Sequence, residues 1–368
     1  MTKTRANRHA LLASLAALAA FAAITPPAAA CCPAPPPGKP AVNADQTVIL
    51  VWDPATKTEH FVRRASFKAE SADFGFLVPT PAQPELAESG DDAFPFFEKV
   101  TEPEVRKVPA PASGGCASCA GESKSAAVMR EPPPQNVKVL EEKAVAGFQA
   151  VVLEATSATA LVGWLKERGY AFSPEVEAWA KPYVDGGWKI TALRVAKDDA
   201  KKSDARVAAA SLRLSFKTDA PLFPYREPDP KGAQALTREG RLLRFYFLSD
   251  ARYDGSLVGA TWTGKTAWAG PLTAEQRARA LDLLRLPAGS AGPPSWYLTE
   301  LEDPWPYRVH PSDLTFARSA TQELVRRPPI LEYVSTDATG RRDDTALAIV
   351  GLLLAPAMMR RLAKRPQR

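Results

Sequence analysis

The sequence predicts an α+β fold made mainly of antiparallel β-strands, with a few short helices. Short runs of β-branched and aromatic residues with period-two alternation follow one another between Gly, Pro and Asp turns, as is typical of strands. Few helical segments separate these runs, which favours an antiparallel α+β domain over a doubly wound sheet. No repeat recurs at a fixed period. We therefore expect residues 31–334 to form one large unit or two closely packed lobes.

The first predicted elements are strands near the N-terminus. Val48, Leu50 and Trp52 alternate with Thr47, Ile49 and Val51, and the turn-like segment DPATK leads to a second strand in residues 59–70. A third strand is expected at residues 74–78, a small helix at 91–100 and another strand at 104–108. Residues 137–156 predict a further hairpin.

Residues 161–195 predict two helices followed by a strand. Ser157 is the expected N-cap of the first helix and Gly169 its end. The second helix should begin with Ser173 as cap and Pro174 at the first helical position, and it should end at Asp185-Gly186-Gly187. Alternation from Trp188 onward predicts the strand that follows.

The second half of the chain adds strands and one capped helix. We expect strands at residues 211–218, 241–250, 256–264, 295–303 and 313–319, with a loop over 219–239. Thr273 and Gln276 form a capping box for a helix at residues 274–286. Residues 328–344 are interpreted as a stalk, of which 335–344 lie beyond the predicted domain.

Several motifs together resemble a known family. They are the sequence WL…GY…P…YVxxGW within residues 161–195, the pair Cys31-Cys32 after an export signal, FGFLVPTPAQPEL (74–86) and LRLSFKTDAPLFPYR (212–226). The chain resembles the bacterial family called domain of unknown function 2330. The resemblance implies an exported bacterial protein of uncharacterised activity, and it supplies no catalytic residues.

The N-terminus predicts export. Residues 1–30 contain Lys3, Arg5 and Arg8, an apolar run from 10 to 24, and three alanines before Cys31. This is the pattern of a secretory signal peptide, with cleavage expected after Ala30. Lipid attachment to Cys31 is a second interpretation, although Ala28 stands where lipoproteins usually have Leu.

The C-terminus predicts a membrane anchor. Residues 345–359 are uncharged, and the tail 360–368 carries five cations. The apolar run is shorter than the roughly 20 residues that span a bilayer comfortably, and Pro356 weakens a helix there. A core helix and a sorting tail removed after export are the alternatives. The anchor is favoured because a core helix seldom ends a chain in so many cations.

The net charge excludes one partner class. The chain has 47 Lys and Arg against 41 Asp and Glu. Three cations lie in residues 1–30 and five in the tail, which leaves 39 cations against 41 acids between them, a net charge of −2. The basic character belongs to the targeting segments, so we expect no nucleic-acid partner.

Four cysteines are expected to form disulfides after export. Cys116 and Cys119 form a C-x-x-C motif in the Gly/Ser-rich segment 109–134, interpreted as a mobile loop, and they pair with each other or with Cys31 and Cys32. No strand and helix frame the motif as in thioredoxin-like proteins. Metal or thiol-disulfide chemistry is the alternative. We otherwise expect no metal and no cofactor.

Catalytic patterns are weak. His60 stands inside a predicted strand and His310 in a loop near Asp313. Glu300 and Glu302 stand two apart in a strand, so both carboxylates share one face, which would suit glycoside chemistry but equally a solvated strand. Sequence motifs for nucleophile elbows, phosphate loops and zinc helices are missing.

Clustered aromatic residues are the remaining candidates for recognition. Trp and Tyr rings stack on sugars or anchor a protein partner, and they also fill cores. The set comprises Trp262, Trp268, Trp296, Tyr297, Trp305 and Tyr307. We expect an exported, membrane-anchored envelope binding or structural module, with a polysaccharide or protein partner. A hydrolase with an unrecognised site and a thiol-disulfide protein using Cys116 and Cys119 are the alternatives.

Overall fold

The computed structural model describes most of the central chain and divides it into two units. The first unit takes in residues 1–101 and 122–325, and the second takes in 102–121 and 326–368. The described residues are 46–64, 75–107, 137–170, 175–194, 211–228, 241–287, 289–290, 292–304 and 312–332, with the backbone alone of 29–30, 32–34, 41–43, 67–69, 108–109, 174, 195 and 333–334.

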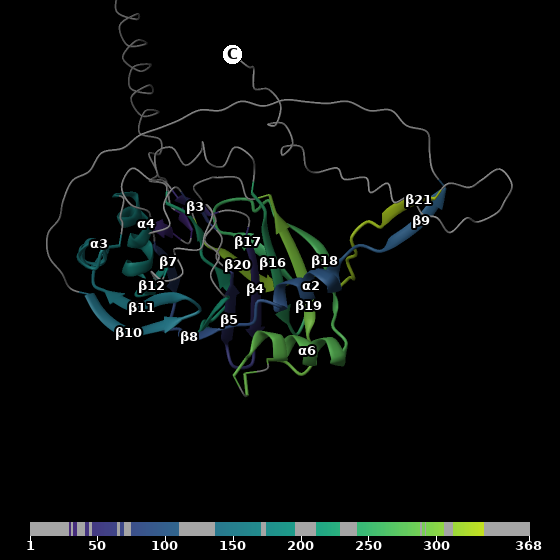
Figure 1. The fold of residues 1–368 in the computed structure, drawn as a ribbon, viewed down its shortest axis with the longest axis horizontal. Helices are drawn as coiled ribbons and strands as arrows, with labels where there is room; N and C mark the ends of the chain where they lie inside the picture. The colour runs from purple at the N-terminus through teal and green to yellow at the C-terminus, as the bar shows by residue number, and fades with distance from the viewer. Residues whose placement is uncertain are drawn as a thin grey trace, which may run out of the picture. The chain divides into compact units, whose positions relative to one another are not determined.

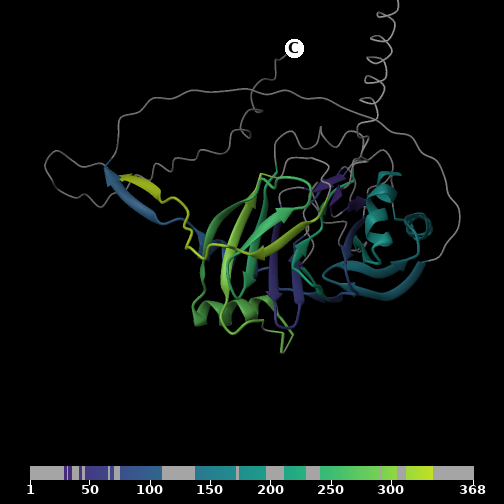
Figure 2. The same ribbon diagram turned by 180° about the vertical axis from the view of Figure 1, so that it is seen from behind.

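The described part of the first unit is a strand-rich α+β fold, as the sequence predicts (Figure 1). A seven-stranded sheet packs face to face against a five-stranded sheet, and helices cover the outer face of each. The view from behind in Figure 2 shows the same order of layers. The core between the two sheets therefore has two layers of strands and no helix.

The seven-stranded sheet is the centre of this unit. Its order is β18 (Lys265–Pro271), β19 (Tyr297–Asp303), β16 (Leu243–Ser249), β4 (Gln46–Asp53), β5 (Thr58–Arg63), β13 (Leu212–Lys217) and β8 (Glu85–Glu88). Neighbours are antiparallel except β4 and β16, which are parallel. These two strands are buried on both faces, as their continuous apolar sequences indicate.

The five-stranded sheet is antiparallel and carries a helical pair. Its order is β10 (Val137–Val145), β11 (Phe148–Ala155), β12 (Lys189–Val195), β7 (Gly75–Thr80) and β2 (Cys32–Ala34). Helices α3 (Ala158–Glu167) and α4 (Pro174–Asp185) pack on one face through Leu161, Trp164 and Trp179. Alternate residues of the same strands face the seven-stranded sheet. Successive side chains therefore enter two different cores, one between the sheets and one beneath α3 and α4.

Smaller strand groups complete the fold. A three-stranded sheet has the order β14 (Leu222–Phe223), β20 (Leu314–Arg318) and β17 (Tyr253–Leu257). Strand β1 (Ala29–Ala30) pairs with β15 (Tyr225–Arg226), and β3 (Ala41–Asn43) pairs with β6 (Phe67–Ala69). In the second unit, β9 (Val105–Pro109) and β21 (Ile330–Val334) form a parallel pair.

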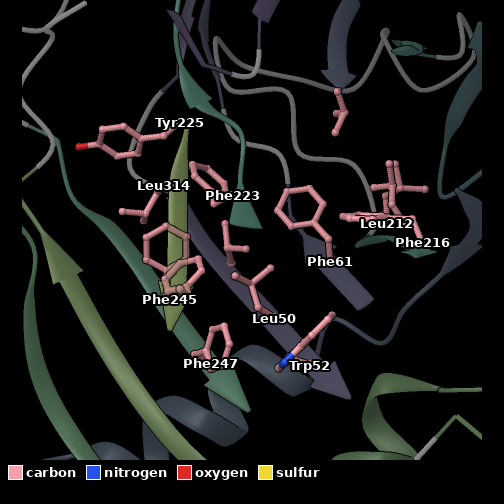
Figure 3. Packing of buried hydrophobic residues seen from close by; sticks show 14 of the residues in the cluster. Leu50, Trp52, Phe61, Leu212, Phe216, Phe223, Tyr225, Phe245, Phe247 and Leu314 are labelled. Carbon is pink, nitrogen blue, oxygen red and sulfur yellow. The ribbon is translucent and has the colours of Figure 1, made fainter. Parts of the chain in front are cut away.

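The core between the sheets is rich in aromatic rings. Phe245 meets Phe223 and Phe316 with ring centroids 5.0 and 5.4 Å apart, both close to edge-to-face. Figure 3 shows part of this core, with the side chains Leu50, Trp52, Phe61, Leu212, Phe216, Phe223, Tyr225, Phe245, Phe247 and Leu314 labelled. The oxygen of Tyr225 points away from the other rings in this view, so the ring belongs to the core and the hydroxyl to its edge.

Helices α2 (Ala93–Thr101) and α6 (Ala274–Leu284) cover the outer face of the seven-stranded sheet. The C-terminus of α6 is held by three donors from other elements. The Gly90 N–H donates to the Leu283 carbonyl at 3.1 Å, the Ser89 hydroxyl to Leu284 at 3.1 Å, and the Arg213 guanidinium to Leu284 at 3.3 Å. A Cβ at Gly90 would lie 2.2 Å from the Leu283 oxygen, so this approach requires glycine.

Most predicted elements within the described residues are confirmed. Ser157 caps α3 by accepting from the Ala160 N–H at 3.0 Å, and the capping box of Thr273 and Gln276 is formed. Gly169 and Gly187 both take φ = +73° at the helix ends. The turns of the hairpins and the strand after α4 also lie where the sequence predicts them.

Three predictions were wrong in detail. The strand expected at 256–264 is instead the end of β17 and a turn, with β18 beginning at Lys265. The loop expected at 219–239 contains β14 and β15. The beginning of the expected stalk is β21, because β9 offers it a main-chain partner that the sequence does not reveal.

Other predictions lie outside the described residues. They are the signal peptide apart from Ala29–Ala30, residues 110–134 of the predicted loop with Cys116 and Cys119, Cys31, the stalk 335–344, segment 345–359 and the tail 360–368. In the part of the chain that the structure describes, none of the helices is long and apolar enough to cross a membrane.

Candidate functional site: a carboxylate seam

Two aspartates, Asp303 fully buried and Asp313 with a side chain 10% exposed, bind β15 and flank one segment of the sequence. Asp303 is the last residue of β19, and Asp313 directly precedes β20. Residues 304–312 connect them and include Trp305, Tyr307 and His310. We call Tyr225, Arg226, Asp303 and Asp313 the carboxylate seam.

Asp303 is fully buried and accepts three hydrogen bonds. The Tyr225 hydroxyl and the indole N–H of Trp262 donate to Oδ2, the latter at 3.0 Å, and the Thr263 hydroxyl donates to Oδ1 at 2.8 Å. The donors come from two segments, one with Tyr225 and one with Trp262 and Thr263. Asp303 therefore ties these two segments to the end of β19.

Trp262 is held in place by two glycines. A Cβ on Gly255 would lie 2.5 Å from the indole ring, and one on Gly264 would lie 2.1 Å from it. Both positions therefore need hydrogen in place of a side chain. The half-buried ring packs edge-to-face on Phe245 at 6.5 Å while its N–H reaches Asp303. This geometry makes Trp262 a fixed donor.

Asp313 holds the main chain of β15. Its Oδ1 accepts from the Tyr183 hydroxyl at 2.7 Å, from the Tyr225 N–H at 3.0 Å and from the Arg226 N–H at 3.4 Å. Its Oδ2 lies 3.5 Å from Arg226 Nε. Burial raises the pKa of Asp313, and the Arg226 charge and the Tyr183 hydrogen bond oppose that rise.

Helix α4 completes the seam. The indole N–H of Trp179 donates to the Arg226 carbonyl at 3.1 Å, and the Arg226 guanidinium lies 5.2 Å from the Tyr183 ring centroid. Burial and the nearby Asp303 charge raise the pKa of the Tyr225 hydroxyl well above its usual value. Tyr225 therefore stays a neutral donor at physiological pH.

The next residue of the chain adds a buried ion pair. Glu227 and Arg241 form two parallel hydrogen bonds of 2.7 and 2.6 Å, and both are buried. A bidentate pair of this kind fixes the two segments that carry it, and breaking it would leave a buried charge. The seam and its flank are thus held by charge-assisted bonds.

The paired carboxylates Glu300 and Glu302 lie on one face of β19, as predicted. Arg244 bridges them, with Nε 3.1 Å from Glu300 and Nη2 2.9 Å from Glu302. One guanidinium therefore engages both carboxylates, in an ion-pair network on this face of the sheet.

His60 belongs to the packing of the seven-stranded sheet. Its Nδ1 lies 2.8 Å from the Ser215 hydroxyl, and both residues are buried. Burial, and then the Arg213 charge, lower the pKa of His60 to about 4, while Asp53 and the Ser290 backbone act in the opposite direction. The imidazole is neutral at physiological pH, and its burial keeps it from acting on a substrate.

The six aromatic candidates separate into four groups. Trp268 and Trp296, 7% and 1% exposed, pack in the core beneath α2 and α6, and Trp262 is part of the seam. Tyr297 is half-buried, with its hydroxyl 3.4 Å from two carbonyls. Trp305 and Tyr307 lie outside the described residues. The four described members of the set therefore do not form one cluster.

The remaining candidates take little part in the described structure. Cys32 is in β2, and Cys31, Cys116, Cys119 and His310 lie outside the described residues. Among described residues, no three His, Cys, Asp or Glu side chains are grouped to hold a metal ion. Sequence reasoning missed the seam itself. The one signal for it was the segment LFPYR, which ends in Tyr225 and Arg226.

Comparisons with known proteins identify a family without an activity. A family described as "Uncharacterized protein conserved in bacteria", domain of unknown function 2330, matches residues 26–317. A search of curated proteins finds no match.

Three matching solved structures are of baculovirus P35. Two are of mutated P35 after caspase cleavage, at 8% and 10% identity with TM-scores of 0.31 and 0.29, and the third is of P35 at 9% and 0.27. The matches cover 78–79% of this chain and 97–100% of P35. Likeness at this level supports no functional statement.

Proposed function

The chain belongs to the bacterial family of domain of unknown function 2330, and on that premise we propose that it is an exported, membrane-anchored binding module of the cell envelope. Export is supported by the signal-like residues 1–30, and anchoring by the uncharged segment 345–359 followed by five cations. The family match begins at residue 26, next to the expected cleavage site, and ends before the predicted anchor.

The carboxylate seam is the observation that favours binding over catalysis. Asp303 and Asp313 each accept three hydrogen bonds, mostly from donors fixed in the core. A general acid or base must exchange protons with a substrate, which fully committed, buried carboxylates do poorly. Their evident role is to fix both ends of residues 304–312. A segment that carries Trp305 and Tyr307 and whose two ends are held in this way suits recognition.

An envelope polysaccharide is the ligand class that we favour. Trp and Tyr rings stack on the apolar faces of sugar rings, and the net charge of −2 between the targeting segments gives no attraction to phosphate-rich polymers. Cleavage after Ala30 would remove β1. Strand β15 would then still be held by Asp313 and Trp179, so the seam would persist in the processed protein.

Cosedimentation with isolated envelope polysaccharide of the producing bacterium tests this function. Trp305→Ala with Tyr307→Ala should abolish cosedimentation without lowering the melting temperature. Tyr297→Ala is the matched control, an aromatic residue of the same set outside the loop, and it should bind normally. Binding unchanged in the loop variant, or capture of an envelope protein in place of polysaccharide, would overturn the polysaccharide assignment.

The thiol-disulfide alternative has its own test. Cys116 and Cys119 stand in a C-x-x-C motif, which is the spacing of a redox dithiol. If this chemistry is the function, Cys116→Ser with Cys119→Ser should abolish disulfide exchange with a model dithiol while the domain stays folded. A double variant that retains the wild-type phenotype removes this alternative.

A further inference from the structure

The second unit contains a parallel ribbon of two strands. β9 and β21 pair in parallel, with Ile330 opposite Val105 and Glu332 opposite Lys107. These two strands form a sheet of their own among the described residues. Parallel strands normally lie inside sheets that are covered on both faces, and two strands alone are marginally stable in water.

The ribbon exposes large apolar side chains. Val105 is 61% exposed, Ile330 54% and Leu331 46%. They are half of the six large hydrophobic residues found exposed in the described chain. Such a concentration on one short element marks an interaction surface.

One face of the ribbon is complementary to itself. Side chains two apart on a strand share a face, so Val105 and Lys107 of β9 lie on the same face as Ile330 and Glu332 of β21. This face has an apolar row, Val105 with Ile330, and a charged row, Lys107 with Glu332. On the opposite face Leu331 lies beside Arg106, and this pair of residues contains no acid that could meet the Arg106 charge of a second copy.

We propose that this face binds the same face of a second copy of the chain, about a two-fold axis parallel to the strands. That axis places β9 of each copy over β21 of the other. Val105 then packs on the partner's Ile330, and Lys107 meets the partner's Glu332. A two-fold axis perpendicular to the strands would instead place Val105 over the partner's Lys107, which satisfies neither row.

The direction of the strands supplies a second argument, which rests on the proposed function. β21 ends at Val334, and the predicted stalk 335–344 leads from there to the predicted anchor. An axis parallel to the strands makes both β21 strands run the same way, as two copies anchored in one membrane require. The face is small, so the dimer is weak in solution, and anchoring strengthens it by raising the effective concentration.

Charge reversal tests the pairing in the full chain, in membranes and after extraction into detergent. Lys107→Glu and Glu332→Lys should each lower the dimer fraction at least tenfold, because like charges then meet across the interface. Co-expressed with different tags, the two variants should associate with each other, since the heterodimer restores opposite charges. Failure of the mixed pair to associate would overturn the proposal.

A matched pair of apolar variants identifies the face. Ile330→Ser should reduce the dimer fraction, and Leu331→Ser, on the other face, should leave it unchanged. The reverse result, or a wild-type chain that is monomeric in membranes, contradicts the proposed interface. Recovery of the chain in the membrane fraction is scored on the same samples. If the chain forms a ribbon-dependent dimer but is not bound to the membrane, the proposed anchor is wrong and the proposed interface stands.

Discussion

Asp303 and Glu59 are both fully buried carboxyl groups, and they differ in their hydrogen-bond partners. Asp303 accepts from Tyr225, Trp262 and Thr263. Glu59, in the core between the sheets, accepts one bond from the Leu222 N–H at 2.9 Å, and its other oxygen has no partner among the described residues. A buried carboxylate is stable as an anion only when donors replace the water that it loses.

Asp303 is thus a carboxyl group with several donors around it, and Glu59 is a buried neutral acid. Burial raises the pKa of Glu59 to about 8, with the Leu222 N–H acting weakly against that rise. Glu59 is therefore protonated at neutral pH. In the seam, by contrast, each carboxyl group accepts three hydrogen bonds, which supports the proposal that the seam holds the two ends of residues 304–312.

Truncation of Asp303 would test the seam most severely. Asp303→Ala should lower the free energy of unfolding by about 3–5 kcal/mol, because it leaves the Tyr225 hydroxyl and the Trp262 N–H buried without an acceptor. Asp303→Asn should cost less, since an amide oxygen can still accept from both. Equal losses in urea titrations of the two variants would show that charge, and not the acceptor, holds the seam.

Replacement of Glu59 by a neutral residue should raise the free energy of unfolding at high pH, whereas the Asp303 variants lower it. The folded pKa of about 8 exceeds the ordinary glutamate pKa of 4.5, so wild-type stability falls as the pH rises from 4.5 through 8. Glu59→Gln should remove this fall and be more stable at pH 9 by on the order of 3 kcal/mol. The two proteins should differ little at pH 4.5. If the unfolding free energies of the wild type and of Glu59→Gln changed in parallel from pH 4.5 to pH 9, the pKa of Glu59 would not be raised.

His60 should give a smaller, acid-side effect. Its folded pKa of about 4 lies below the ordinary histidine pKa of 6.5, so its contribution to stability is complete above pH 6.5 and is lost as the pH falls toward 4. Relative to His60→Gln, the wild type should lose an additional 2 kcal/mol or so between pH 7 and pH 4. Thermal unfolding at both pH values measures it, and a greater acid loss in the variant would contradict the assignment.

The smallest effect is expected outside the first unit. Ile330→Ser changes an exposed residue of the ribbon, so the main unfolding transition of detergent-extracted protein should move by less than about 0.5 kcal/mol. A loss as large as that of Asp303→Ala would mean that the ribbon is part of the cooperative core. The control is Leu331→Ser, for which the same small change is expected.

Local signals predicted much of this fold. The ends of a helix depend on residues that are close in sequence. The sequence alone therefore predicted the roles of Ser157, Gly169, Thr273 and Gln276. Strands β4 and β16 were visible as apolar runs. Their parallel pairing was not, because the choice of neighbour depends on contacts made by residues about 200 positions apart.

The candidate site was far less predictable. Asp303 reads as the polar end of a strand and Tyr225 as one aromatic residue in a proline-containing loop. Their hydrogen bond joins segments that only the tertiary fold brings together. Trp296 was expected in a possible recognition set and is instead a core residue, since ring spacing in the sequence carries no information on exposure.

Fractionation of cells with intact-mass analysis and protease shaving tests whether the chain is exported and anchored. We expect membrane recovery of a chain that begins at Cys31, digestion of its main domain from outside, and protection of the C-terminal peptide. A soluble chain that keeps residues 345–368, or a membrane-bound chain whose domain resists protease until the cytoplasm is opened, would contradict an exported, anchored module.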